Sequence, residues 1–288
     1  MALATIALML IGLETVTRFG FHRISRIESR IHADKEAAIA VRNGGAKPTI
    51  LLLGNSLLLE GLDYDAIRRE MAPYATPTRF IIEQTSYLDW YYGIQRLFED
   101  GARPDRIVLC LSIPQLLASS LRGDYSAFYL LRTQDLASAG WESHYDLTRI
   151  SSLFFGRYSL YFAGRNNVRN FVLNTLHPGY GQVLPSLTRG PTAEIGDAAV
   201  LAGAAPRLEK LREACARWNT RFDFLLPPGF GSGEPGLIEA GRKSRTPVLI
   251  PAPLNAWGPE MFRDGFYVSR DGAARFTAGL VSALRRQP

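Results

Sequence analysis

The stretch that decides the fold is ILLLGNSLLLEGLD, residues 50–63. Four apolar residues run directly into Gly54-Asn55-Ser56, and a second apolar run follows. An apolar run before a break of this kind is typical of a strand that is buried on both faces, as in parallel sheets. The polar break has two interpretations: a turn that needs small residues, or a nucleophile held at the end of the buried strand.

Composition limits the class of protein. The chain has 288 residues, of which 47% are hydrophobic and 21% charged, so it can bury a sizeable core. Its net charge of +6 is spread along the chain, and we expect no nucleic-acid partner. The two cysteines, Cys110 and Cys215, predict no disulfide framework, and no His/Cys cluster has metal-ligand spacing. We therefore expect neither a metal nor a cofactor.

Short apolar runs alternate with helical patterns along the rest of the chain. The runs at 49–53, 79–82, 106–111, 222–226 and 248–250 predict strands, and helices are expected at 64–72, 88–100, 206–219 and 269–285. This alternation predicts an α/β fold, a three-layer sandwich of the flavodoxin-like type with a five-stranded parallel sheet. An aromatic-rich insertion at about 120–200 is expected to form a helical cap over the carboxyl ends of the strands, or else a helical excursion with no ligand role.

The N-terminal segment has a membrane-like pattern. Residues 2–13 are apolar apart from Thr5 up to Glu14, yet twelve residues are too few to span a bilayer, which takes about 20. The next stretch places apolar side chains on one helix face and arginines on the other: Phe21, Ile24, Ile27 and Ile31 against Arg18, Arg23, Arg26 and Arg30. We expect residues 1–45 to form a membrane anchor, a basic amphipathic helix and a linker, and 46–288 to form the α/β domain. A buried core helix is the other interpretation of residues 2–13.

Two distant stretches carry a family resemblance. Gly54-Asn55-Ser56 follows the first strand, and MFRDGFYVSRDGAARFT, residues 261–277, lies late in the chain. Together they resemble the first and last blocks of the SGNH or GDSL-type serine hydrolases and acyltransferases. The first block is Gly-Asp-Ser, often Gly-Asn-Ser in divergent members, and the last block is Asp-x-x-His. The resemblance implies that Ser56 is the nucleophile and Asp264 the aspartate of the last block. It also implies an acyl ester of a cell-envelope glycan or lipid as substrate, hydrolysed or transferred at a membrane.

The chain departs from the family's pattern at three blocks. Tyr267 stands at the position of the family's histidine. The second block, around Thr85, has no glycine for the oxyanion, and the third block has Ser112 and Gln115 but no asparagine. The resemblance still implies that Asn55, Thr85, Ser112 and Gln115 line the site or its oxyanion position. Because a phenol has a pKa near 10, only about one tyrosine in a thousand is ionised at pH 7, so Tyr267 is a poor base. Another histidine (His144 or His177) could act instead, Ser56 could act with poor assistance, or the site could bind without turnover.

Two functions therefore stay open. One is a membrane-associated SGNH-like enzyme acting through Ser56. The other is a catalytically inactive relative that binds an envelope polymer or a partner protein. The resemblance implies the extracytoplasmic face of the inner membrane, whereas the basic flank favours the cytoplasmic face. A nucleotide-binding domain is disfavoured, because residues 54–60 lack the glycine pattern of a phosphate turn. Asn55 is expected to stabilise the turn, and the loop 229–233 to lie at the rim of the site.

Overall fold

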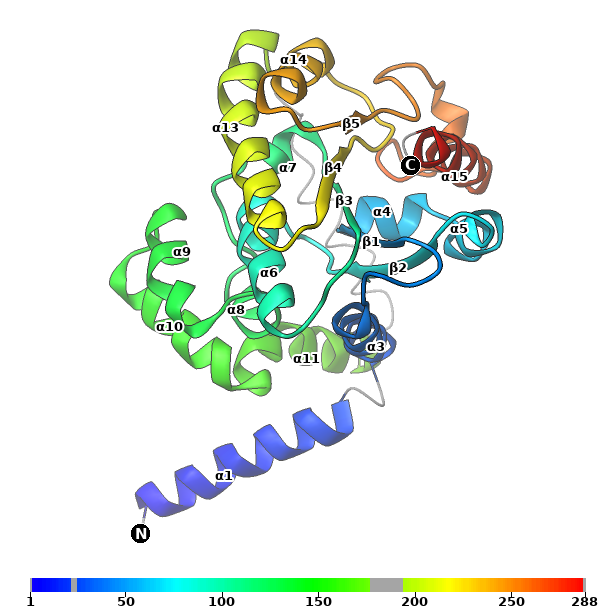
Figure 1. The fold of residues 1–288 in the computed structure, drawn as a ribbon. Coiled ribbons are helices and arrows are strands. Elements are labelled where there is room, and N and C mark those ends of the chain that lie inside the picture. Colours follow the sequence, from blue (N-terminus) through cyan, green and yellow to red (C-terminus); the bar gives the residue numbers. More distant parts are fainter. Residues whose placement is uncertain (1, 22–24, 177–193, 287–288) are drawn as a thin grey trace.

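The core of the protein is a five-stranded, wholly parallel sheet. We describe it from a computed structural model that covers residues 2–21, 25–176 and 194–286 (Figure 1). The strands are β1 (Thr49–Gly54), β2 (Thr76–Ile81), β3 (Arg106–Cys110), β4 (Arg221–Leu225) and β5 (Val248–Leu249). Their order is β2-β1-β3-β4-β5, and each neighbouring pair runs parallel. This confirms the predicted sheet, in the order typical of flavodoxin-like folds.

Strand β1 shows why these runs are apolar throughout. Leu51 and Leu53 point into one hydrophobic cluster, whereas Ile50 and Leu52 point into the other. Successive side chains of a strand face opposite sides of the sheet, so a strand covered on both faces has no position for a polar residue. The run before Gly54 is therefore apolar because helices cover both faces of the sheet at β1.

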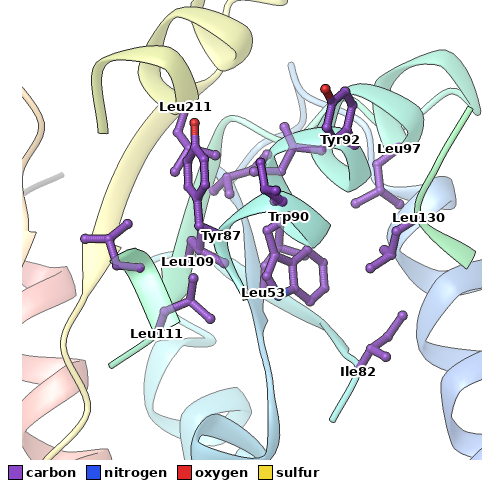
Figure 2. Close-up of a cluster of buried hydrophobic side chains, with 14 of the residues drawn as sticks. Leu53, Ile82, Tyr87, Trp90, Tyr92, Leu97, Leu109, Leu111, Leu130 and Leu211 are labelled. Atoms are coloured by element: carbon purple, nitrogen blue, oxygen red, sulfur yellow. The ribbon is translucent and has the colours of Figure 1, made fainter. Parts of the chain in front are cut away.

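Helices form the two outer layers. One face of the sheet is covered by α3 (Arg26–Ala40), α6 (Tyr87–Glu99), α13 (Asp197–Ala216) and α14 (Glu234–Ser244). The other face is covered by α4 (Ser56–Gly61), α5 (Tyr64–Met71) and α15 (Arg270–Arg285). Figure 2 shows the first cluster, in which Trp90 of α6 is wholly buried beside Leu53 and Leu109 of the sheet.

Two helices differ from the sequence prediction. Helix α13 begins at Asp197 and contains Pro206, which had been expected to start it. The alanine-rich stretch before Pro206 favours helix strongly enough to extend it past the proline. Helix α14 was not predicted. Its buried Leu237 and Ala240 complete the cover of the sheet near β5, packed beside α13.

Most of the described insertion packs on the helical layer of α3 and α6, and its residues Glu194 and Ile195 reach the carboxyl ends of the strands. Helix α7 (Ile113–Leu117) precedes the insertion. The insertion contains α8 (Asp124–Tyr129), a 3₁₀ turn (Thr133–Asp135), α9 (Leu136–Glu142), α10 (Leu147–Tyr158) and α11 (Leu160–Leu176). Helices α8 to α11 lie outside α3 and α6 (Figure 1). Arg96 of α6 donates to the carbonyl of Leu131 at 3.0 Å, and Tyr92 donates to Glu142 at 3.0 Å. Of the aromatic side chains of the insertion, Tyr125 and Tyr129 are buried in this contact, whereas Trp141, Phe155 and Tyr158 are exposed.

The N-terminal segment divides into two parts with different surroundings. Helix α1 (Ala2–Val16) projects from the body (Figure 1), whereas the π-helical turn after it (Thr17–Phe21) packs against α11 and buries Thr17. Among the described residues, no helix is both long and apolar enough to cross a membrane. At its carboxyl end α1 is attached to the body, because Glu14 accepts hydrogen bonds from the Ser159 hydroxyl at 2.7 Å and the Leu160 amide at 3.0 Å.

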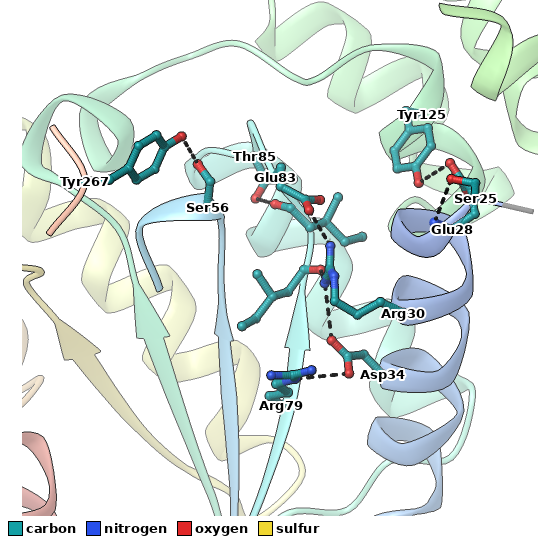
Figure 3. A network of polar contacts seen from close by, with 12 residues as sticks. Ser25, Glu28, Arg30, Asp34, Ser56, Arg79, Glu83, Thr85, Tyr125 and Tyr267 are labelled. Carbon is teal, nitrogen blue, oxygen red and sulfur yellow. Dashed lines mark hydrogen bonds and ion pairs between the residues drawn. The ribbon is translucent and has the colours of Figure 1, made fainter. Parts of the chain in front are cut away.

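Helix α3 belongs to the α/β body, so the predicted boundary at residue 45 does not hold for it. Ile31 is fully buried, and Arg30 donates to the carbonyl of Ile81, at the end of β2, at 2.8 Å. Arg30 also pairs with Glu83 and, at 3.3 Å, with Asp34 (Figure 3). An amphipathic pattern shows only that one helix face is covered, and here a sheet covers it instead of lipid. Arg23 and Ile24 of the predicted helix lie outside the described residues.

Replacing Ile31 by alanine tests this packing. We expect Ile31→Ala to lower the free energy of unfolding by about 2–5 kcal/mol, since it leaves a cavity between α3 and the sheet. The matched control is Ile27→Ala on the same helix, because Ile27 is 53% exposed. That control should change stability by less than about 0.5 kcal/mol. Urea unfolding followed by tryptophan fluorescence measures both, and equal effects would contradict the packing of α3.

Candidate active site

The loop after β1 places Ser56 at the carboxyl edge of the sheet. Strand β1 ends at Gly54, and a Cβ there would lie 2.9 Å from the carbonyl oxygen of Cys110 and 3.1 Å from Leu58. Neither neighbour can retreat easily, since one is the backbone of β3 and the other belongs to α4. Only glycine allows the chain to turn here from the strand into α4, whose first residue is Ser56.

Asn55 holds this turn in place. It is 0% exposed, its Oδ1 accepts the amide of Leu57 at 3.0 Å, and its Nδ2 donates to the carbonyl of Thr85 at 2.9 Å. The side chain therefore caps α4 and joins the loop after β1 to the loop after β2. This agrees with the turn-stabilising interpretation of Asn55. An amide suits the position because one end must accept a hydrogen bond and the other must donate one.

The late motif forms a small hairpin after β5. Phe262 and Val268 form an antiparallel bridge, the amide of Arg263 donates to the carbonyl of Tyr267 at 2.7 Å, and Gly265 adopts φ +76° at the tip. Oδ1 of Asp264 accepts the Tyr267 amide at 2.8 Å. Asp264 thus shapes the turn that directs the Tyr267 ring toward the edge of the sheet.

Ser56 and Tyr267 meet at this edge. The Tyr267 hydroxyl lies 3.0 Å from Oγ of Ser56, although 211 residues separate them in the sequence (Figure 3). Both side chains are partly buried, whereas Asp264 is exposed. Arg263 lies over the Tyr267 ring, with its Cζ 5.4 Å from the ring centroid. The group that contacts the candidate nucleophile is therefore a phenol, which can donate or accept a hydrogen bond but is a weak base at pH 7.

The other predicted site residues divide into two groups. Thr85 does not line the site with its side chain, which corrects that prediction. It is buried, donates to the carbonyl of Ile82 at 2.7 Å and accepts from the Trp90 indole at 2.9 Å. Ser112 and Gln115 lie after β3 and form a reciprocal cap at the start of α7. Both of them line a cavity beside the Ser56–Tyr267 pair.

This apolar cavity has a volume of about 330 Å³. Its walls come from the carboxyl ends of β1, β3, β4 and β5: Leu57, 112–115, 226–232 and Leu254, with Glu194, Ile195, Gly265 and Phe266 at its rim. It lies at the carboxyl ends of β3 to β5, next to the point between β1 and β3 where the strand order reverses, which is the usual ligand position in such sheets. Sequence reasoning placed the glycine-rich loop at this rim but missed Ile113 and Phe266. The position of Phe266 beside Tyr267 was the available signal.

No described histidine replaces the missing base. His32 pairs with Glu36 on the exposed side of α3, and His144 follows α9 in the insertion. His177 lies outside the described residues. Within the described ranges, no group of three His, Cys, Asp or Glu side chains could hold a metal ion.

Comparisons with known proteins give weak similarities only. No family model matches the chain, and no curated protein matches it. It is similar to the psychrotrophic esterase EstA from Pseudoalteromonas sp., with a TM-score of 0.42 and 9% identity over 83% of this chain and 98% of that one. It is also similar to TesA, with a TM-score of 0.41 and 11% identity over 83% of this chain and 98% of that one. Both TM-scores are too low to carry an argument about family or activity.

The role of Asn55 can be tested by an aspartate of nearly the same shape. In Asn55→Asp a carboxylate replaces the buried Nδ2 donor and faces the carbonyl of Thr85. We expect a loss of about 3 kcal/mol at pH 7, since the buried charge has no donor there. The pKa of this new carboxyl should be raised in the folded state. The loss should therefore be smallest below the unfolded pKa of about 4 and grow as the pH rises.

The matched control is Asn255→Asp. Asn255 is exposed, and its Nδ2 also donates to a carbonyl, that of Gly231, at 2.7 Å. Its carboxylate stays in water, so we expect a loss under about 1 kcal/mol with little dependence on pH. Urea unfolding between pH 4 and 8 measures both variants. A pH-independent loss in Asn55→Asp would contradict the buried donor.

Proposed function

We propose that this chain is an SGNH-hydrolase-like protein that acts on acyl esters through Ser56, by hydrolysis or acyl transfer. The observation that carries the proposal is the 3.0 Å contact between the Ser56 and Tyr267 hydroxyls. It lies beside an apolar cavity of about 330 Å³ at the carboxyl edge of a parallel sheet. A hydroxyl nucleophile, a proton-carrying neighbour and an apolar pocket are the parts that acyl transfer needs.

The chemistry would proceed in two steps. The Ser56 oxygen attacks the ester carbonyl, and the leaving alkoxide departs to give an acyl-serine. Tyr267 would accept the Ser56 proton while its own proton passes to the leaving oxygen, so that the phenol is neutral before and after. Water or an acceptor hydroxyl then attacks the acyl-serine, and the proton returns along the same path. Because this relay involves no strong base, we expect slow turnover.

The apolar cavity supports an acyl group as the part of the substrate that is bound. Leu57, Ile113 and Phe230 are among its lining residues, and Ser112 and Gln115 place polar groups at the end nearest α7. An aliphatic chain gains free energy by leaving water for such a surface. The ester carbon would then lie at the mouth of the cavity, where Ser56 stands.

A second candidate is a protein that binds an acylated envelope polymer, or a partner protein, without turnover. Tyr267 occupies the position of the base, and Asp264 Oδ1 accepts two backbone amides, those of Phe266 and Tyr267. A carboxylate used to shape a turn favours this second candidate, because an orienting carboxylate acts on the base itself.

Membrane attachment through α1 is a further part of the proposal. Leu8, Met9, Leu10 and Ile11 are all more than half exposed on the projecting helix. Exposed apolar surface of this kind marks a contact with lipid or with protein. The extracytoplasmic side of the inner membrane, and an envelope glycan or lipid as the acyl carrier, rest on the sequence resemblance alone.

Variants of Tyr267 test the acyl chemistry. We expect the native protein to react slowly with a fluorophosphonate probe and with p-nitrophenyl butyrate, and Tyr267→Phe to lower both rates by about 10²-fold. Tyr267→His supplies a base with a pKa near 6.5. The imidazole is shorter than the phenol, however, so a water must bridge it to Ser56, and we expect a gain of no more than about 10²-fold.

Ser56→Ala is the control for these rates, since it removes the nucleophile and leaves the cavity. Its rate should equal that of the uncatalysed reaction. If native protein and Ser56→Ala are indistinguishable in labelling and hydrolysis, the enzymatic proposal fails and the binding protein becomes the better candidate. Fast native turnover would instead show that Ser56 has a stronger base than Tyr267.

Charged substitutions in α1 test the membrane contact. We expect the full chain to sediment with vesicles of phosphatidylglycerol and phosphatidylcholine. The double variant Leu8→Glu/Ile11→Glu should bind at least about tenfold more weakly, since two large apolar groups no longer enter the bilayer. Ile238→Glu is the control, because Ile238 is 51% exposed on α14, on the opposite side of the body from α1 (Figure 1). Equal binding by both variants would leave α1 without this role.

A further inference from the structure

A second cavity, of about 350 Å³, lies beside the loop after β2. It is formed by Gln84, directly after β2, and by side chains of the insertion. The described residues that line it include three arginines, Arg122, Arg149 and Arg165, and one carboxylate, Asp124. We call it the arginine cavity. Its formal charge is positive, and neither the proposed chemistry nor the apolar cavity uses it.

The single carboxylate of the arginine cavity is already neutralised. Asp124 pairs with Arg165 at 2.6 Å and accepts the Ser152 hydroxyl at 2.7 Å. These contacts join α8, α10 and α11. The charges of Asp124 and Arg165 therefore cancel each other, and the positive character of the cavity comes from the two other arginines.

Arg122 and Arg149 are held by aromatic rings instead of carboxylates. The Cζ of Arg122 lies 4.1 Å from the ring centroid of Tyr125, and that of Arg149 lies 5.5 Å from the ring of Tyr145. Tyr125 is itself anchored by a 2.9 Å hydrogen bond to Glu28. A ring face orients a guanidinium but leaves its in-plane N–H groups unused. Neither arginine has an ion pair within the part of the chain that the structure describes.

A buried donor atom of Arg122 is the second observation that points to an anionic ligand. Nη1 of Arg122 is buried and has no hydrogen-bond partner among the described residues. A buried charged donor without a partner is costly, and a bound oxyanion would satisfy it. Two guanidinium groups that present free N–H edges to one cavity match the paired oxygens of a carboxylate or phosphate.

We infer that the arginine cavity binds an acidic saccharide, with the acidic group on Arg122 and Arg149. The neutral amides of Gln84 and Asn166 also line the cavity and suit sugar hydroxyls, which both donate and accept. The lining offers little for a lipid tail, since beyond its two tyrosines the only apolar side chain in the described lining is that of Ala163.

The arginine cavity adjoins the Ser56 loop. Gln84 lines the cavity and is followed by Thr85. The Thr85 carbonyl accepts a hydrogen bond from Nδ2 of Asn55 at 2.9 Å, and Asn55 is followed by Ser56. An acidic sugar in this cavity would direct the next sugar of the same chain toward Ser56. The inference rests on the proposed function and assigns its substrate class, an acylated acidic glycan.

The test is calorimetric binding of trigalacturonic acid to the full-length Ser56→Ala protein, with maltotriose as the neutral match. We expect binding of trigalacturonic acid only, and a loss of about tenfold or more in Arg149→Gln and in Arg122→Gln. Arg69→Gln on α5 is the control, because Arg69 is exposed and lines neither cavity. Arg149 is exposed, so its variant stays informative if Arg122→Gln fails to fold.

Three results would overturn the inference. One is equal binding of maltotriose, or no binding of either sugar. Another is binding of inorganic phosphate without the trisaccharide, which would indicate a small-anion site. The third is arginine-dependent binding to phosphatidylglycerol vesicles without the trisaccharide, which would indicate a lipid headgroup. Ester hydrolysis by the native protein without saccharide binding would refute this inference alone. Saccharide binding without hydrolysis would refute only the enzymatic proposal.

Discussion

The close packing at Gly54 is the constraint on which the site depends. Strand β1 ends where the backbone of β3 and the Leu58 side chain leave no room for a Cβ. The chain can therefore turn at once into α4, and Asn55 fixes that turn by bonding to the carbonyl of Thr85. The position of Ser56, the first residue of α4, is thereby fixed relative to the sheet. A larger residue at 54 would push β1 from β3 or α4 from the sheet, and the candidate nucleophile would move with it.

Parallel strands bring the remaining parts of the site together. All five strands end at one edge, so the loops after β1, β2, β3 and β5 meet there although they are far apart in the chain. The Ser56–Tyr267 pair lies between an apolar cavity on the β3–β5 side and the arginine cavity on the β2 side. Such an arrangement suits a substrate with an apolar acyl group and an acidic body, which is the substrate class that we propose.

Outside the sheet, the sequence patterns did not predict which surface each apolar helix face contacts. The periodicity of Ile27 and Ile31 fits a helix on a membrane as well as a helix on a sheet. The structure assigns Ile31 to the body and leaves Ile27 largely in solvent. Similarly, the aromatic residues of the insertion predicted a ligand cap, yet α8 to α11 pack outside α3 and α6. Apolar side chains on one face of a helix indicate that the face is buried, but they do not show whether lipid, a ligand or another part of the protein buries it.

The sequence by itself determined the parallel sheet and placed Ser56 at the end of its first strand. Local apolar runs and turn residues are properties of neighbouring positions, and they can be read without knowing the rest of the chain. Only the tertiary structure decided that Tyr267 contacts Ser56, that Thr85 faces Trp90, and that Arg122 and Arg149 share one cavity. Those facts depend on distances between segments far apart in the sequence, which long-range packing sets and no local pattern contains.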